Sequence, residues 1–104
     1  MTGTEKQIAW AEQIKTDAIN TLDANIARTA TEKLLEEDHQ SYRILKAITV
    51  MTFEKTQDAG ALIDRREHFA PAQLNRTASQ WADALRFGRI TVEKLAEINH
   101  VTNW

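Results

Sequence analysis

The sequence predicts an all-α fold: a four- to five-helix bundle with a long N-terminal helical hairpin and shorter C-terminal helices. The first long run, from Glu5 to about Ala27, is amphipathic and contains neither Gly nor Pro. Elsewhere apolar residues recur at three- and four-residue steps, and no segment alternates as a strand would. A chain of 104 residues has room for one core, so we expect a single helical domain over residues 1–104. The chain has no Cys, so this domain folds without a disulfide.

The first helix is predicted to begin with a capping box, in which Thr4 is the N-cap and Gln7 reaches back to it. The apolar residues that follow form one stripe: Ile8, Ala11, Ile14, Ala18, Ile19, Leu22 and Ile26. Trp10 lies beside this stripe. It therefore either flanks the core or is free to contact a partner.

A second helix is predicted from about Thr31 to Gln57. The residues expected on its buried face are Leu34, Leu35, Tyr42, Leu45, Ile48, Thr49 and Phe53. Ile44, Val50 and Met51 lie off that face, so the helix is apolar on more than one side. Such a helix is either central in the bundle or covered by a second chain. With the first helix it would form an antiparallel hairpin roughly 35 Å long.

The C-terminal part is predicted to hold shorter helices. A short segment over residues 58–68 is expected next, with a kink or break near residues 57–60 because Gly60 disfavours a helix interior. Pro71 suits the first turn of the following helix. The core stripe of that helix is Leu74, Ala78, Trp81 and Leu85. Gly88 is expected to end it, and Thr91 to cap a final helix. Three residues of this last segment are expected to face inward: Leu95, Ile98 and Val101.

Composition argues against several functional classes. The net charge of −2 provides no overall attraction to nucleic acid or to an anionic membrane. No stretch approaches the ~18 apolar residues that a membrane span needs, and the N-terminus lacks the apolar centre of a signal peptide. The absence of Cys is typical of the cytoplasm. We therefore expect a cytoplasmic protein without a membrane partner.

Catalytic motifs are also missing from the sequence. The three glycines are too scattered to form a phosphate-binding loop. Ser41 and Ser79 lie in predicted helices without a glycine elbow, and there is no thiol nucleophile. We expect neither catalytic residues nor a cofactor, and hence no enzyme.

A metal centre is the most specific enzymatic alternative. Three carboxylate–imidazole pairs have a helical spacing that could present both ligands together: Glu36/His39, Glu97/His100 and Asp64/His68. A di-metal bundle needs these side chains to face inward. The two Glu-x-x-His pairs point away from the predicted apolar stripes, so we expect no metal site.

The opening segment 5–15 reads EKQIAWAEQIK. It resembles the start of a group of small bacterial and phage-type helical proteins, in which EKQIxWAxxI is followed further along by a tract ending near WWIDNR. The tract at 61–66 reads ALIDRR, which shares the Ile-Asp pair and the final Arg but lacks the aromatic pair and the Asn. This resemblance implies a helical fold and a phage or mobile-element accessory context. It implies no catalytic residue.

The preferred functional interpretation is stoichiometric binding to a protein partner or to a second copy of the chain. The sequence has three Trp, and Trp and Arg are the usual anchors of protein interfaces. The expected contact residues are Trp10, Arg65, Arg66, Arg86, Arg89 and Trp104. In a mobile-element context the partner would be a host complex such as a CRISPR effector, which would make the protein an anti-CRISPR.

The alternative is a DNA-binding regulator built on residues 79–101, which read as helix, turn and helix. Ala84 and Gly88 have a spacing compatible with a helix-turn-helix. Basic side chains that could meet phosphates there are Arg86, Arg89 and Lys94. The turn is long, however, and Glu93 and Glu97 would repel phosphate.

Overall fold

The computed structural model describes residues 1–104 and contains no strand. The predicted all-α class is confirmed. The five α-helices are α1 (Glu5–Thr29), α2 (Glu36–Lys55), α3 (Ala59–Asp64), α4 (Pro71–Arg86) and α5 (Val92–Ile98). Two 3-10 turns complete the order: η1 (Lys33–Leu35) between α1 and α2, and η2 (Arg66–Phe69) between α3 and α4.

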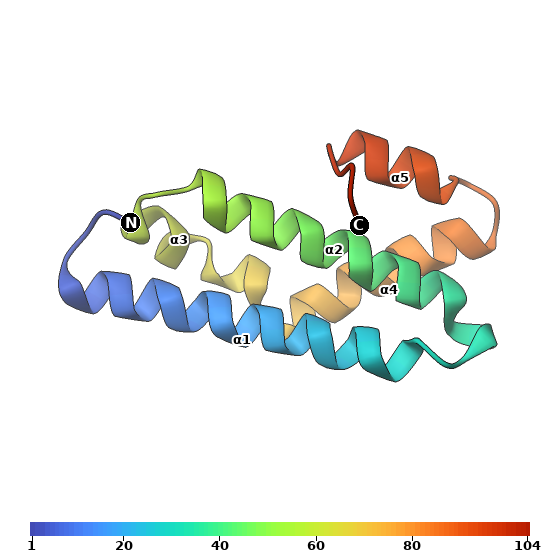
Figure 1. Ribbon diagram of the computed structural model, residues 1–104, viewed down its shortest axis with the longest axis horizontal. Coiled ribbons are helices and arrows are strands. Elements are labelled where there is room, and N and C mark those ends of the chain that lie inside the picture. Colours follow the sequence, from blue (N-terminus) through green and yellow to red (C-terminus); the bar gives the residue numbers. More distant parts are fainter.

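The two long helices α1 and α2 run antiparallel along the longest axis and form the predicted hairpin (Figure 1). The elements α3, η2 and α4 form a second layer against this hairpin, and α5 lies on the far side of α2 from α1 (Figure 1). The molecule measures 45 × 25 × 20 Å. None of its helices combines the length and apolar character needed to cross a membrane.

The start of α1 confirms the predicted capping box. Thr4 Oγ1 accepts a hydrogen bond from Gln7 N at 3.1 Å, and Gln7 Oε1 accepts one from Thr4 N at 3.0 Å. These two bonds satisfy donors that the first turn of a helix leaves without partners. From the predicted stripe, Ala11, Ala18 and Leu22 are fully buried.

The predicted start of the second helix near Thr31 is wrong. The chain first makes the 3-10 turn η1, and α2 begins only at Glu36. Leu34, which was expected on the buried face, is 87% exposed. The 3-10 turn has a different residue spacing from α2, so Leu34 is out of register with the helix that follows. Within α2 itself the face is correct, since four of its members are buried: Tyr42, Leu45, Thr49 and Phe53.

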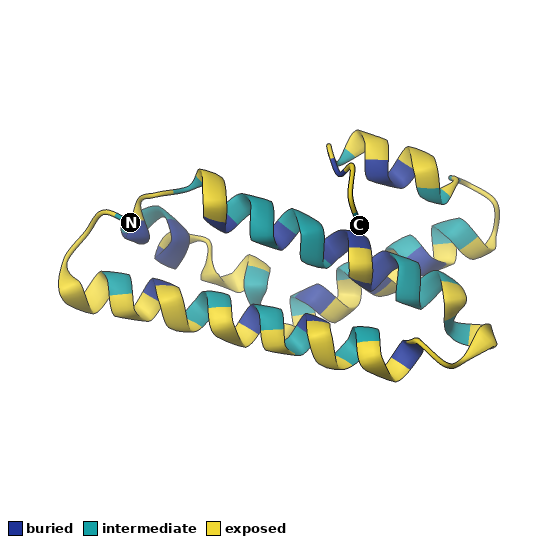
Figure 2. Cartoon of the chain, viewed as in Figure 1, coloured by how far each residue is buried: buried dark blue, intermediate teal, exposed yellow.

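The structure confirms that α2 is central. One cluster joins it to α1 and α4 and consists of Ala18, Leu22, Tyr42, Leu45, Leu74 and Ala78. A second cluster closes the other end of the hairpin with Ala11, Phe53, Ala59 and Leu62. The third cluster joins α2 to α5 and consists of Ile44, Leu95, Ala96 and Val101. Figure 2 shows these buried positions on the facing sides of the helices. Ile44 is therefore covered within the chain.

The predicted break near residues 57–60 is found at residues 56–58, between α2 and α3, and Gly60 itself lies in the first turn of α3. Asp58 caps this helix, because its Oδ1 accepts a hydrogen bond from Gly60 N at 2.9 Å. The extended N-terminus pairs with the same segment: Ala59 N donates to Thr2 O at 2.8 Å, and Thr2 N donates to Gln57 O. This single bridge between distant segments has no counterpart in the helical pattern of the sequence.

The end of α4 has the expected glycine signal. Gly88 has a φ of +70°. Gly88 N donates to Leu85 O at 3.2 Å and Arg89 N donates to Ala84 O at 2.9 Å, which together form a Schellman motif. Trp81, a member of the predicted stripe, is partly buried and packs against both the first and the third clusters.

The final helix α5 begins as predicted, since Thr91 Oγ1 accepts a hydrogen bond from Lys94 N at 3.2 Å. The expectation that Ile98 faces inward is wrong, because it is 53% exposed. The helix is short and turns back at once, with Val101 N donating to Ala96 O at 2.9 Å. That turn returns Val101 to the core and leaves Ile98 on the outer side.

Candidate functional site

The structure pairs Trp10 with Arg66. Trp10 is 49% exposed on α1, and Arg66 Cζ lies 5.4 Å from the centroid of its ring. Arg66 Nη1 also donates a hydrogen bond to Ile63 O at 3.0 Å. A cation–π contact of this exposed kind contributes about 0.5–1 kcal/mol. The two contacts hold the guanidinium over the ring, so the pair presents a pre-organised aromatic and cationic surface.

The Arg65 side chain lies at a different surface. It lines an open groove of about 400 Å³ between α2, η2 and α4. The other lining residues are Leu45, Ile48, Thr49, Thr52, His68, Phe69 and Leu74. We call this the Arg65 groove. The two adjacent arginines therefore serve separate surfaces, which their neighbouring positions in the sequence did not reveal.

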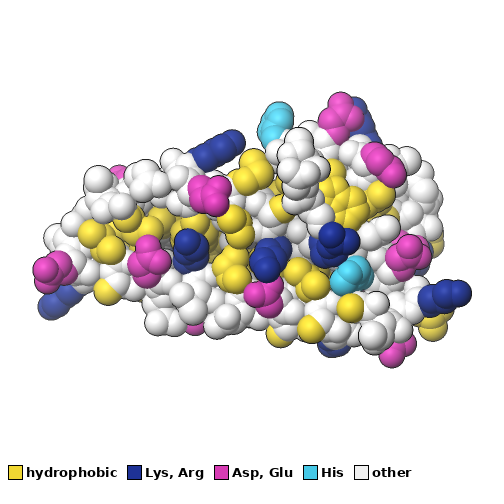
Figure 3. All heavy atoms as spheres, viewed as in Figure 1, with side chains coloured by type: hydrophobic (Ala, Val, Ile, Leu, Met, Phe, Trp, Pro, Cys, Tyr) yellow, Lys and Arg dark blue, Asp and Glu magenta, His cyan; other side chains and the backbone are white.

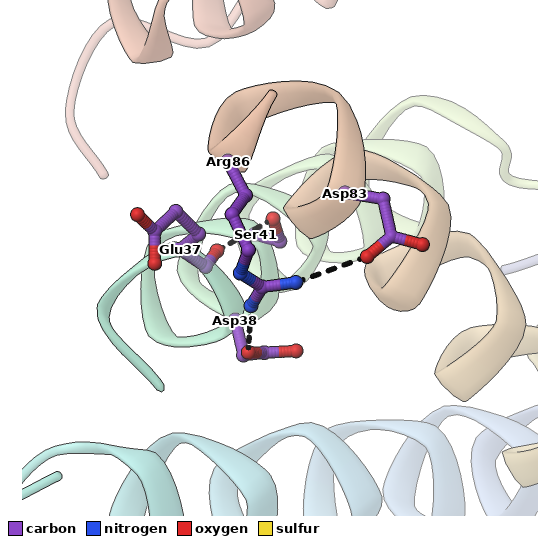
Figure 4. Close-up of polar contacts among 5 residues, drawn as sticks. All are labelled: Glu37, Asp38, Ser41, Asp83 and Arg86. Carbon is purple, nitrogen blue, oxygen red and sulfur yellow. Dashed lines mark hydrogen bonds and ion pairs between the residues drawn. The ribbon is translucent and has the colours of Figure 1, made fainter. Parts of the chain in front are cut away.

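Arg86 is held between two carboxylates. Its Nη2 lies 3.0 Å from Asp38 Oδ2 on α2, and its Nη1 lies 3.0 Å from Asp83 Oδ1 on α4 (Figure 4). In the same view, Ser41 Oγ donates to Glu37 O at 2.8 Å within α2. The structure thus gives the Arg86 guanidinium a role in joining α4 to the first turns of α2.

Arg89 stacks on Phe87 in the turn after α4. Its Cζ lies 5.7 Å from the centroid of the Phe87 ring, and Phe87 is 70% exposed. Sequence reasoning did not select Phe87 as a contact residue. The available signal was its position at the end of a helix, where the apolar stripe had already finished and an Arg followed two residues later.

Trp104 contacts Arg43, which sequence reasoning also did not select. Arg43 Cζ lies 5.1 Å from the Trp104 ring, and Trp104 is partly buried against the third cluster. Both residues line a second open groove of about 540 Å³, which we call the Trp104 groove. Its other lining residues are Asp23, Ile26, Lys46, Ala47, Val50, Met51, Val101, Thr102 and Asn103. On the face shown in Figure 3, hydrophobic side chains follow the seam between α1 and α2, with charged side chains scattered over them.

The carboxylate–imidazole pairs do not converge on a metal position. No group of three or more His, Cys, Asp or Glu side chains is arranged to hold an ion. His39 Nδ1 instead lies 3.0 Å from Thr29 Oγ1 and 3.2 Å from Ile26 O. Because a carbonyl oxygen only accepts, this contact with Ile26 requires a hydrogen on Nδ1. His39 therefore links α2 to the end of α1.

The segment 79–101 comprises the end of α4, the turn at 87–91 and the seven residues of α5. Arg86 is already paired with two carboxylates. Lys94 Nζ lies 3.7 Å from Glu97 Oε1. Acidic side chains therefore accompany two of the three basic ones, and only Arg89 has no carboxylate partner, so the segment offers phosphates little uncompensated positive charge.

Comparison with models of protein families, with curated proteins and with solved structures found no match to this chain. Four surfaces combine an aromatic or apolar area with a cation that no carboxylate neutralises: the Trp10–Arg66 pair, the Arg65 groove, the Phe87–Arg89 pair and the Arg43–Trp104 contact in the Trp104 groove.

Proposed function

We propose that the protein is a non-catalytic binding module that forms a stoichiometric complex with a protein partner through the Trp10–Arg66 pair. The observation that carries this proposal is the half-exposed indole with a guanidinium held over its ring. Trp and Arg are among the residues that dominate binding energy at protein interfaces. A side chain that is already ordered loses less conformational entropy on association.

The surroundings of the pair support this role. Lys6 and Gln13 lie one helical turn to either side of Trp10 on α1, and both are exposed. An aromatic centre with a polar rim is the usual arrangement of an interface patch. The 25-residue helix that carries Trp10 is capped at its start and packed along its length, so it is a firm support for such a patch.

The biological context of the proposal comes from the resemblance of segment 5–15 to phage-type proteins. In that context we place the protein in the cytoplasm, where its partner would be a host complex such as a CRISPR effector. A second copy of the chain is the other protein that could occupy the same patch. Sedimentation of the purified protein distinguishes these cases, because only self-association would depend on its own concentration.

The test is a tagged pull-down from lysate of the organism that carries the gene, with nuclease present and at low and moderate salt. The wild type is compared with Trp10→Ala, Arg66→Ala and the control Arg76→Ala, which changes an exposed arginine on α4. We expect wild type and Arg76→Ala to retain one protein in stoichiometric amount and the other two variants to lose it. Equal recovery by Trp10→Ala would contradict the proposal. Recovery of nuclease-sensitive material alone would favour the DNA-binding alternative.

A further inference from the structure

We propose that the Arg65 groove binds a small amphiphilic carboxylate, a molecule with one carboxylate and an unbranched or aromatic apolar body. Its volume of about 400 Å³ lies within the range of about 300–1,000 Å³ that is common for small-ligand sites. This inference is independent of the proposed function, because the Trp10–Arg66 pair is not part of the groove.

The apolar side chains of the groove determine the body of the ligand. Leu45 and Leu74 are buried, and Ile48 and Phe69 are partly buried. Together they line the groove from α2, η2 and α4. Transferring an apolar chain from water to such a surface is favourable by about 25 cal/mol per Å² of area removed from water.

The charges at the groove determine the head group of the ligand. Arg65 and His68 are both exposed, and neither side chain forms an ion pair or hydrogen bond within the chain. No Asp or Glu lines the groove. A guanidinium binds a carboxylate through two parallel hydrogen bonds, so Arg65 is the expected anchor.

The two threonines in the wall have no hydrogen-bond donor left for a polar ligand body. Thr49 Oγ1 donates to Leu45 O at 2.8 Å, and Thr52 Oγ1 donates to Ile48 O at 2.9 Å. Because each hydroxyl has one hydrogen, both donors are already used. Arg65 and His68 are therefore the only lining side chains with donors to offer, and both come from η2 and its N-cap.

The Trp104 groove is less suited to an anion. Asp23 lines it, and this carboxylate already pairs with Lys46. Arg43 is in contact with the Trp104 ring. An anion there would face a carboxylate and a guanidinium that is already engaged, so the Arg65 groove is the better site.

The test uses octanoate below its micellar concentration as the probe and the ¹⁵N-labelled full chain as the receptor. Octan-1-ol and octylamine are matched controls with the same chain length. We expect saturable shifts of the backbone amides of Thr49, Thr52, Arg65, His68 and Leu74. Octan-1-ol should bind about tenfold more weakly because it loses a charge-assisted hydrogen bond. Octylamine should bind more weakly still, because its ammonium group is positively charged and is repelled by the Arg65 guanidinium.

Three variants locate the site. Arg65→Gln should weaken octanoate about tenfold and leave octan-1-ol unchanged. Thr52→Glu should abolish octanoate binding by placing a carboxylate in the wall, and Arg43→Gln should have no effect. Circular dichroism establishes that each variant is folded. Equal affinity for octanoate and octan-1-ol, an unchanged affinity in Arg65→Gln, or a loss in Arg43→Gln would each overturn the proposal.

Discussion

Tyr42 is the only tyrosine in the chain, and its hydroxyl donates a hydrogen bond to Asn75 Oδ1 at 2.9 Å. Burial raises the pKa of Tyr42 above its ordinary value, while the positive charge of Arg28 opposes this effect. The folded state therefore binds the phenolic proton more tightly than the unfolded state. It follows that this group contributes stability below its unfolded pKa, and that the contribution is lost as pH rises through the folded pKa.

We therefore predict that phenolate absorbance titrates above pH 10.0 in the folded protein and returns to the ordinary range in urea. Because there is a single tyrosine, this signal belongs to Tyr42 alone. Alkaline loss of unfolding free energy should also be smaller in Tyr42→Phe than in the wild type. A phenolate that titrates identically in folded and unfolded protein would show that Tyr42 is not desolvated.

His100 is the only residue other than glycine with a positive φ, at 59°. It occupies the position after α5 where glycine is favoured, because a Cβ in this region of backbone space is strained. We predict that His100→Gly raises the free energy of unfolding by about 0.5–1 kcal/mol in urea titration. Gly88→Ala, which adds a Cβ at φ +70°, should lower it by a similar amount. If His100→Gly and Gly88→Ala both raise or both lower the free energy of unfolding, the turns after α4 and α5 do not share the left-handed geometry, and the prediction is wrong.

At the scale of elements, one ion pair joins the two layers and another joins the two helices of the hairpin. Arg86 joins α4 to α2 through Asp38, and Lys46 on α2 pairs with Asp23 on α1. The side chains involved are partly exposed, and pairs of this kind contribute about 0–1 kcal/mol each. They orient helices whose attachment depends on the buried clusters.

We predict a coupling of about 0.2–1 kcal/mol between Arg86 and Asp38 in a double-mutant cycle with Arg86→Gln and Asp38→Asn. The coupling should decrease when the salt concentration is raised to 1 M, because added salt screens exposed charges. Urea unfolding of the four proteins measures it. A coupling that is absent at low salt would mean that the contact adds no stability.

At the scale of the whole molecule, the Trp81 side chain connects two of the three buried clusters of the core. It packs against the cluster shared by α1, α2 and α4 and also against the cluster between α2 and α5. We predict that Trp81→Ala costs ~3–5 kcal/mol of unfolding free energy. Trp10→Ala is the matched control and should cost only about 0.5–1 kcal/mol, the contribution of its exposed cation–π contact with Arg66. A near-neutral Trp81→Ala would mean that α5 and α4 do not depend on this side chain.

Several local features follow from the sequence because their physical causes are local. The Thr4 and Gln7 capping box, Pro71 in the first turn of α4, and the glycine at position 88 each depend on neighbouring backbone groups. The faces of the long helices follow from the period of their apolar residues, which recurs over many turns. These signals are strong enough to determine the all-α class and the hairpin.

Other features depend on the tertiary structure because their causes are distant in the chain. Leu34 and Ile98 lie in short or irregular segments, where a few residues do not define a face. The side-chain positions of Arg65 and Arg66 depend on which helices pack on either side of η2. Arg86 pairs with Asp38 on α2, which lies 48 positions away in the chain.

The sequence by itself determined that this chain forms a helical domain, where its first long helix begins and which faces of the long helices are buried. Helical periodicity and capping are properties of consecutive residues, so the sequence contains them directly. Only the tertiary structure decided which basic and aromatic residues meet. It placed Trp10 against Arg66, Arg43 against Trp104 and Arg65 in a groove without carboxylates, because such neighbours depend on how the helices pack.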